Sequence, residues 1–526
     1  MSEIHDECGV AAVYCLKYSS ESAICNFADQ KYCSYMIPRM LQDIQNRGQL
    51  AAGMTSYSPT RGQLLVTHKE VGAVSEVFRL SHKLKSENLM KRFAGKAAIG
   101  HVRYATCGTD DASYAQPFER QHIQKAKWFS FAFNGQLANY QQLRDELLKE
   151  NENHLARETD TEIILHEISR VLSRDPKANF LSVMQHLSRR FDGAYALAML
   201  TAQGDMLVAR DPLGIKPMCY AFDGCVFAAA SENVALLNLG FEPSQIHDLA
   251  PGYMATIVDG EFSVQPYIQS KSRAHCFFEW IYFANVASTL DQRSVYLTRT
   301  HLGRELAAAE RTHPMFDWTD GNTIVVPVPD TSKAAADAMA FSLGVPSVEG
   351  LIRNRYSGRT FIENTPEQRM QRAKAKYTPL REVLEGKRVI LVEDSIVRST
   401  TMKVLLSRIY DRGGAKEVHV RVACPPIVAP CFYGIDMPTI NELFAPKYLN
   451  DLTEPDDQVH AMMASNLQCD SLRYLPREAI ARAIQMPADS LCQACVSGKY
   501  PTPAGQQLYQ LVLGGAYSAA GRPLDK

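Results

Sequence analysis

The stretch Arg388-Val389-Ile390-Leu391-Val392-Glu393-Asp394-Ser395-Ile396-Val397-Arg398-Ser399-Thr400-Thr401 decides the fold of the second half of the chain. An apolar run rich in β-branched residues ends in two carboxylates, and a short hydroxyl-rich loop follows. A helical pattern comes next, with Val404, Leu405 and Ile409 on one face and Gly413-Gly414 as a stop. The loop's N–H groups and the helix N-terminus suit a phosphate, and the carboxylates suit sugar hydroxyls. The pattern therefore predicts a site for a phosphorylated sugar, although an ordinary loop after a buried strand is common.

This stretch resembles the phosphoribosylpyrophosphate (PRPP) signature of type I phosphoribosyltransferases, and its Ser395–Arg398 core is similar to the amidotransferase branch of that family. The resemblance implies that Glu393 and Asp394 bind the ribose hydroxyls. It also implies a cradle for the 5′-phosphate, made of Ser395, Ile396, Val397, Arg398, Ser399, Thr400 and Thr401.

Two residues of this stretch differ from the usual signature. Glu393 stands where Asp is commonest, which is a modest change because related transferases use a Glu-Asp pair. Ser399 stands where Gly is usual. If that position needs a positive φ, a serine costs on the order of 1 kcal/mol or more. Alternatively, Ser399 adds a hydroxyl donor to the phosphate, and the sequence leaves both explanations open.

Composition limits the class of protein. A chain of 526 residues suggests two or more domains. A formal net charge of −1 gives no electrostatic footprint for nucleic acid or an anionic membrane. No apolar stretch approaches the ~20 residues that a membrane span needs. The short acidic start is unlike a secretory signal, so we expect a cytoplasmic protein whose thirteen cysteines are thiols or metal ligands.

The two halves of the chain differ in texture. Up to about Ser270, short β-like runs alternate with turns, which predicts a layered α+β domain. Expected strands are Lys96–Gly100, Trp128–Phe133 and Ala194–Leu200, and expected helices are Tyr140–Lys149 and Asp160–Leu172. From about His275, strand–helix alternation predicts an α/β domain with a parallel sheet, containing Thr323–Pro329, Arg388–Val392 and Glu417–Ala423. We place the boundary between Gln265 and His275, giving domains 8–270 and 271–500 and a polar tail, 501–526, at the surface or partly disordered.

Four segments accompany the near-terminal Cys8 in the first half. They are Arg47-Gly48-Gln49, Gly100-His101-Val102-Arg103-Tyr104-Ala105-Thr106, Phe133-Asn134-Gly135-Gln136 and Glu158-Thr159-Asp160-Thr161-Glu162. Most free cysteines are small buried residues. These segments, in this order, instead resemble the glutaminase domain of class II amidotransferases, which has an N-terminal-nucleophile αββα fold.

The resemblance implies a role for each residue. With residues 1–7 removed as a propeptide, Cys8 carries an α-amino group with a pKa of about 7.7–8.0, which can take the thiol proton. Asn134 and the Gly135 N–H stabilise the oxyanion. Arg103 binds the glutamine α-carboxylate and Asp160 the α-ammonium. A surface ion pair and a helix N-cap are the structural alternatives for these last two residues.

Some residues depart from the amidotransferase pattern. Phe133 and Gln136 flank the Asn-Gly pair where His and Asn are more frequent, and Leu50 follows Arg-Gly-Gln where Asp is usual. We expect altered packing and kinetics with glutaminase activity retained.

Nearly the whole chain, from Cys8 to about Thr502, is similar to the glutamine PRPP amidotransferase family. The resemblance implies that Arg355 to Lys376 closes over PRPP, although such charges alone are typical of a solvated helix. The basic residues suited to pyrophosphate are Arg369, Arg372, Lys374 and Lys376. Mg²⁺ would be held mainly by PRPP oxygens and water, with Asp330, Glu393 and Asp394 as candidate protein ligands. Tyr104 is a plausible residue for coupling the two sites.

Four cysteines carry a further signal. Cys492 and Cys495 form a C-x-x-C pair, which alone is consistent with zinc, redox chemistry or neither. With Cys276 and Cys431 they resemble the ligand set of an iron–sulfur subclass that is made with a propeptide. Four such thiolates would hold a structural [4Fe–4S] cluster, with tetrahedral zinc as the competing interpretation. Cys424 and Cys469 are expected to be buried structural thiols.

The resulting prediction is an amidophosphoribosyltransferase that makes 5-phosphoribosylamine, glutamate and pyrophosphate from PRPP, glutamine and water, the first committed step of purine synthesis. The resemblance also implies feedback inhibition by purine nucleotides and a homodimer or homotetramer. The alternative is a PRPP- or nucleotide-sensing paralogue, with catalysis weakened by Ser399, Phe133 and Leu50.

Overall fold

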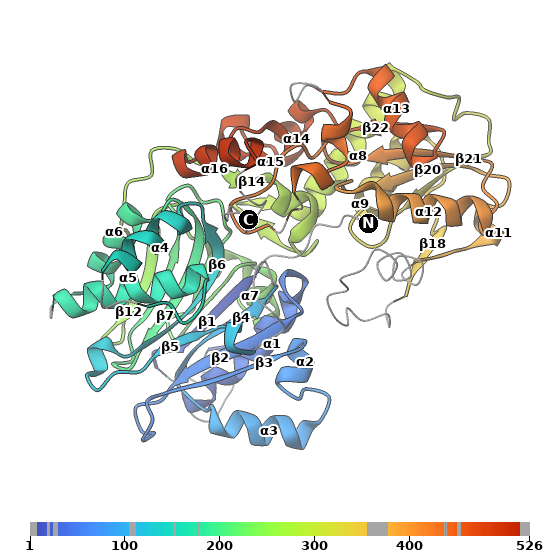
Figure 1. Cartoon of the computed structure of the whole chain (residues 1–526). Coiled ribbons are helices and arrows are strands. Elements are labelled where there is room, and N and C mark those ends of the chain that lie inside the picture. The colour runs from blue at the N-terminus through green and yellow to red at the C-terminus, as the bar shows by residue number, and fades with distance from the viewer. Residues whose placement is uncertain are drawn as a thin grey trace.

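A computed structural model describes residues 8–17, 22–24, 30–104, 112–150, 154–175, 178–354, 377–435, 437, 439–449 and 454–515. The predicted propeptide, the loop from 355 to 376 and the end of the tail after 515 lie outside the described residues. The chain forms two sheet-containing halves in sequence order (Figure 1). We call residues 8–270 the first half and residues 271–515 the second half.

The first half contains two antiparallel sheets. One has, in order across the sheet, β11 (Ile246–Asp248), β9 (Cys219–Phe222), β10 (Val226–Ala230), β1 (Gly9–Cys15), β4 (Ala97–Arg103), β2 (Ala51–Tyr57) and β3 (Leu65–Val71). The other has β13 (Glu261–Pro266), β12 (Tyr253–Val258), β8 (Met206–Arg210), β7 (Gly193–Thr201), β6 (Phe129–Leu137) and β5 (Phe118–Arg120).

Three apolar layers hold this half together. Val10, Ile99 and Leu200 belong to a core between the two sheets. Helices α1 (Met36–Asp43), α2 (Val74–Val77), α3 (Lys83–Arg92) and α7 (Val234–Leu239) cover the outer face of the first sheet. Helices α4 (Tyr140–Lys149), α5 (Asp160–Arg174) and α6 (Phe180–Arg190) cover that of the second. This αββα arrangement confirms the predicted fold class.

The expected end of the strand at Phe133 was wrong, and the difference concerns the predicted oxyanion residues. The strand expected to end at Phe133 continues as β6 to Leu137, so Asn134 and Gly135 are strand residues. An Asn-Gly pair usually marks a turn, but here both residues pair with Ala196 and Tyr195 of β7. Tertiary pairing therefore overrides the local signal and fixes the Asn-Gly backbone.

The second half contains the predicted parallel sheet. Its order is β17 (Thr323–Pro327), β20 (Arg388–Glu393), β21 (Glu417–Val422) and β22 (Ser471–Tyr474), and the last strand was not predicted. Its longer helices are α8 (Val295–Thr312), α9 (Lys333–Leu343), α12 (Ser399–Asp411), α13 (Asp457–Leu467) and α14 (Arg477–Ile484). Helix α12 follows β20 as predicted, but its buried face consists of Met402, Leu405, Leu406 and Ile409, with Val404 only half-buried.

The last described segment returns to the first half. Residues 503–513, expected within a polar tail, form helix α16 (Pro503–Leu513), because Thr502 caps its first turn and Leu508 and Tyr509 are buried. The Ala504 N–H donates to Asp192 of the first half at 3.0 Å. Among the described residues, the helices are all too short or too polar to cross a membrane.

Candidate active sites

Cys8 lies at the entrance to the central strand of the first sheet. Gly9 of β1 pairs with Val102 of β4, which places Cys8 beside the Arg103–Tyr104 end of that strand. The Cys8 thiol donates to the Tyr104 carbonyl at 3.8 Å. Arg103, predicted to bind glutamine, is almost fully buried. Cys8 and Arg103 are thus distant in sequence but close in the fold, where they form the base of the predicted glutamine site.

The Arg47-Gly48-Gln49-Leu50 segment packs against the backbone of Arg103. A Cβ atom on Gly48 would lie 2.6 Å from the Arg103 carbonyl carbon, so only glycine permits this approach. The Leu50 N–H donates to the Arg103 carbonyl at 3.0 Å. Leu50, at the position where an Asp is usual, therefore contributes to this site through its backbone.

The predicted oxyanion pair lies on β6. Asn134 is buried, and Gly135 has φ +149°. A Cβ atom on Gly135 would lie 1.9 Å from the Ala194 carbonyl oxygen, so both conformation and space require glycine. His101 and Gln116 both bond to the Phe133 carbonyl at 3.1 Å, and the Phe133 N–H donates to Gln116 at 2.7 Å. No sequence motif indicated these bonds, which fix the backbone next to Asn134.

Asp160 lies at the carboxyl end of β6. It is the first residue of α5, and its carboxylate accepts the Leu137 N–H at 3.2 Å. The helix N-cap is Thr159, so the structural alternative of Asp160 as an N-cap does not apply. Through Leu137, the predicted ammonium ligand is tied to the strand that carries the Asn134-Gly135 pair.

In the second half, Glu393 and Asp394 are buried where β20 ends. Asp394 accepts hydrogen bonds from the hydroxyls of Thr331 and Ser395, the latter at 2.8 Å. Burial raises the pKa of Glu393, and the neighbouring charge of Asp394 raises it further. Burial also raises the pKa of Asp394, against the effect of its hydroxyl partners. Two adjacent buried carboxylates form an anionic site that favours hydrogen-bond donors and cations.

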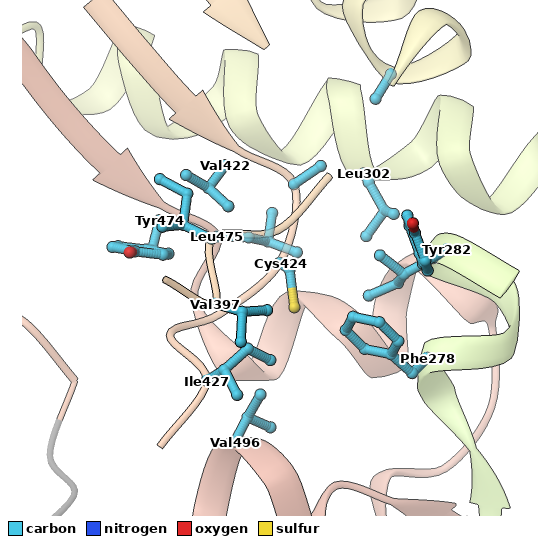
Figure 2. Packing of buried hydrophobic residues seen from close by; sticks show 14 of the residues in the cluster. Phe278, Tyr282, Leu302, Val397, Val422, Cys424, Ile427, Tyr474, Leu475 and Val496 are labelled. Carbon is cyan, nitrogen blue, oxygen red and sulfur yellow. The ribbon is translucent and has the colours of Figure 1, made fainter. Parts of the chain in front are cut away.

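The loop after these carboxylates turns its apolar side chains inward. The side chains of Ile396 and Val397 are buried, so these two residues could bind a ligand only through their backbone groups, such as the N–H donors. Figure 2 shows Val397 in one core with Phe278, Tyr282, Ile427 and Val496. Cys424 points into the same apolar core and is fully buried, as expected for a structural thiol.

Ser399 is the first residue of α12, which follows the loop. None of the described loop residues 395–401 has a positive φ, so the strain considered for serine at this position does not arise. Its hydroxyl, with those of Thr400 and Thr401, lies in the first turn of a 13-residue helix. This part of the predicted cradle therefore combines a helix N-terminus with hydroxyl donors.

Asp330 lies at the same edge of the sheet, in the loop after β17. It is exposed, and its carboxylate pairs with Arg353 at 2.7 Å. Its neighbour Thr331 is the residue that contacts Asp394, a link that the sequence did not reveal. Arg353 ends β18 (Leu351–Arg353), which pairs with β19 (Tyr377–Pro379), so the described strands on either side of the predicted PRPP loop lie next to each other.

The four predicted cluster cysteines line one small cavity. Cys276 of β14 (His275–Cys276) and Cys492 of β23 (Leu491–Cys492) are partners in a parallel pair. Cys495 lies in α15 (Ala494–Ser497), and Cys431 accepts the Tyr433 N–H at 3.4 Å. Burial raises the pKa of Cys492 to about 12. No three His, Cys, Asp or Glu side chains in the described ranges are spaced to hold an ion as they stand, but four soft donors around one cavity suit a thiolate-bound metal group.

The cysteine cavity adjoins the predicted glutamine site. Lys216 is buried and lines the cavity. Gly434 has φ +109°, and a Cβ atom there would lie 3.1 Å from Lys216 Nζ and 3.2 Å from the Gly135 carbonyl carbon. The segment after Cys431 thus packs against the predicted oxyanion glycine, a proximity that no sequence motif indicated.

The chain is similar to known proteins over most of its length. A family model described as a glutamine amidotransferase domain matches residues 86–259. An amidophosphoribosyltransferase of Methanothermobacter thermautotrophicus is 37% identical over 502 residues, which cover 95% of this chain and 96% of the relative. An amidophosphoribosyltransferase of Bacillus subtilis is 34% identical over 478 residues, which cover 89% of this chain and 91% of the relative.

Solved structures match over a similar extent. A glutamine PRPP amidotransferase from B. subtilis, complexed with ADP and GMP, has a TM-score of 0.77 at 31% identity, covering 94% of this chain and 98% of that one. A structure described as the allosteric regulatory enzyme of purine biosynthesis has a TM-score of 0.78 at 31% identity, covering 94% and 97%.

Proposed function

The chain belongs to the amidophosphoribosyltransferase family, and from this premise we propose how its two sites divide the family's reaction. The enzyme transfers the amide nitrogen of glutamine to PRPP in the first step of purine biosynthesis. The first half would release ammonia from glutamine, and the second half would join it to the ribose.

In the first half, Cys8 would act as the nucleophile once residues 1–7 are removed. Its α-amino group takes the thiol proton, and the sulfur attacks the glutamine amide to form a γ-glutamyl thioester, with the amide nitrogen leaving as ammonia after it receives that proton. Water then hydrolyses the thioester to glutamate and restores the Cys8 thiol. Asn134 and the Gly135 N–H stabilise the oxyanion, an interaction worth roughly 3–4 kcal/mol per donor. Arg103 and Asp160 hold the α-carboxylate and α-ammonium of the substrate.

In the second half, Glu393 and Asp394 would accept hydrogen bonds from the ribose hydroxyls. The 5′-phosphate would lie in the loop and first turn from Ser395 to Thr401. Positive charge develops on the ribose as pyrophosphate leaves, and these carboxylates would stabilise it. The carboxylates of Asp330, Glu393 and Asp394 fit the oxygen preference of Mg²⁺, which would offset the pyrophosphate charge when bound.

The observation that carries this proposal is the pair of buried carboxylates followed by a hydroxyl-bearing helix N-terminus, Glu393 to Thr401. We expect the purified protein to release pyrophosphate from PRPP and Mg²⁺ with glutamine and, separately, with ammonium. The sensing alternative predicts release with neither. Ser399→Gly separates the two further, because the unstrained Ser399 backbone predicts no gain in PRPP affinity, whereas a degraded site would gain affinity.

We also propose that Cys276, Cys431, Cys492 and Cys495 hold a structural [4Fe–4S] cluster, supported by their shared cavity. Anaerobically purified protein is expected to contain about four iron atoms and four acid-labile sulfides per chain. Cys492→Ser should remove most of both, whereas Cys469→Ser, outside the cavity, should keep them. About one zinc per chain without sulfide would contradict the cluster and favour a Cys₄ zinc site.

Regulation and assembly are proposed from relatives. Because the B. subtilis structure holds ADP and GMP, we propose purine nucleotides as feedback inhibitors of this enzyme. A homodimer or homotetramer and a cytoplasmic location stay predictions from the family resemblance.

A further inference from the structure

Arg47 is the centre of a fully buried group of charges. Its side chain is shielded from solvent, as is that of Glu232, and Glu279 is 2% exposed. The Arg47 Nη1 atom donates to Glu232 at 2.8 Å and the Nη2 atom donates to Glu279 at 2.5 Å. The two carboxylates therefore occupy the two ends of one planar guanidinium.

The third edge of this guanidinium faces the predicted nucleophile. Arg47 Nε donates to the Cys8 carbonyl at 3.2 Å. Cys8 precedes β1, whose pairing with β4 begins at Gly9. The hydrogen bond from Arg47 therefore restrains the backbone of Cys8 directly. Cys8 lies one position before Gly9, where the sheet pairing begins.

The two carboxylates come from different halves of the chain. Glu232 belongs to the first half, whereas Glu279 opens a π-helical turn, Glu279–Phe283, in the second half. Arg299 fixes this turn by donating to the carbonyls of Trp280, Tyr282 and Ala284 at 2.9–3.0 Å. A π-helical turn is an irregular geometry that is frequent at functional sites, and here it places Glu279 against Arg47.

Further bonds tie the same two halves around Glu232. Asn46 donates to Glu232 at 2.9 Å and to the Phe283 carbonyl at 2.8 Å, so it joins the far end of the turn to the first half. The Asn285 N–H and the Ser288 hydroxyl, both from the second half, donate to Glu232 at 2.7 Å. These bonds between the two halves fix the position of Glu279 relative to Arg47.

We propose that Glu279 is a positioning residue for glutamine hydrolysis: by holding Arg47, it sets the position of Cys8 from the other half of the enzyme. A guanidinium with one carboxylate removed keeps its charge in a buried site and must find another partner. Arg47 would then turn away from the Cys8 carbonyl. The nucleophile would lose alignment with the Asn134-Gly135 pair, while Arg103 and Asp160 would still bind glutamine.

The test is Glu279→Gln, measured in the full-length enzyme. The inference rests on the proposed role of Cys8 as nucleophile. We expect kcat for glutamine hydrolysis to fall about tenfold to a hundredfold, as for a misplaced reacting group, with the glutamine KM within about twofold. Alkylation of Cys8 by iodoacetamide, followed by mass spectrometry, should slow in parallel. Ammonia-dependent activity should stay within about twofold, since it does not use Cys8.

Glu310→Gln is the matched control, because Glu310 is an equally buried carboxylate that pairs with Arg421, at 2.5 Å, in the second half. Glu279→Gln removes the buried ion pair with Arg47, and Glu310→Gln removes two, because Glu310 also pairs with Arg473 at 3.2 Å. If Glu279→Gln slows glutamine hydrolysis and Cys8 alkylation no more than Glu310→Gln does, the positioning role is wrong. A parallel loss of ammonia-dependent activity would also overturn it.

Glu279→Asp provides a variant that keeps the charge, in case Glu279→Gln does not fold. It should restore part of the hydrolysis rate, and no restoration relative to Glu279→Ala would count against the inference. Failure of the underlying assignment has a different signature, because Cys8→Ala would then retain glutamine-dependent activity.

Discussion

Replacing Cys8 by alanine is expected to abolish glutamine-dependent formation of 5-phosphoribosylamine and to leave the ammonia-dependent reaction within about twofold. The thiol is the only group in the proposed mechanism that forms a covalent bond to glutamine. Glutamine-dependent activity should therefore fall about 10³-fold or more. Pyrophosphate release from PRPP, measured with glutamine and with ammonium at matched pH, checks both parts of the expectation.

The control is Cys33→Ala, which removes a fully buried thiol from the core of the same half. It should keep glutamine-dependent activity while lowering stability, because it leaves a small cavity. Retention of residues 1–7 should have the same effect as Cys8→Ala, since the α-amino group of Cys8 would then be an amide. A Cys8→Ala enzyme that still uses glutamine would refute the assignment of the nucleophile.

More of the fold than of the two sites could be predicted from the sequence. The strand–helix alternation from about His275 predicted the parallel sheet, and the short strands of the first half predicted a layered α+β domain, whereas its αββα arrangement was implied by the family resemblance. The strand end at Phe133 was wrong because cross-strand pairing with β7 extends β6 through an Asn-Gly pair. Local propensity is a weak guide wherever a neighbouring strand supplies the missing hydrogen bonds.

The contacts that complete the sites come from residues without a motif of their own. Thr331 reaches Asp394, Gln116 clamps Phe133, and Glu279 reaches Arg47 across 232 positions of sequence. Such pairings depend on tertiary packing, within each half for Thr331 and Gln116 and between the halves for Glu279. No periodicity or spacing within one segment encodes that packing, so the sequence alone could name the motif residues but not their partners.

Glu393→Gln, in the buried carboxylate pair, is expected to lower activity and to change the pH dependence of stability. Glutamine keeps the volume but removes the negative charge near the ribose. We expect turnover with both glutamine and ammonium to fall on the order of 100-fold. Loss with both nitrogen sources distinguishes this defect from that of Cys8→Ala.

The stability effect follows from the direction of the pKa shift. Burial raises the pKa of Glu393 above its ordinary value of 4.5. The folded protein without ligand therefore binds this proton more tightly than the unfolded chain does. Stability from the protonated form is complete below pH ~4.5 and is lost as the pH rises through the raised pKa. Glu393→Gln removes that loss, so its melting temperature should rise relative to the wild type from acidic to alkaline pH.

Glu417→Gln should show the opposite trend. Hydrogen bonding to Arg388 lowers the pKa of Glu417 to about 2. Its ionised form thus stabilises the fold above pH ~4.5, and this stabilisation is lost as the pH falls through the lowered pKa. Glu417→Gln should therefore melt below the wild type at neutral pH and approach it in acid. A Glu393→Gln protein with a pH-independent difference in melting temperature would show that the Glu393 carboxyl is not held at a raised pKa, because only a group that titrates differently on folding couples stability to pH.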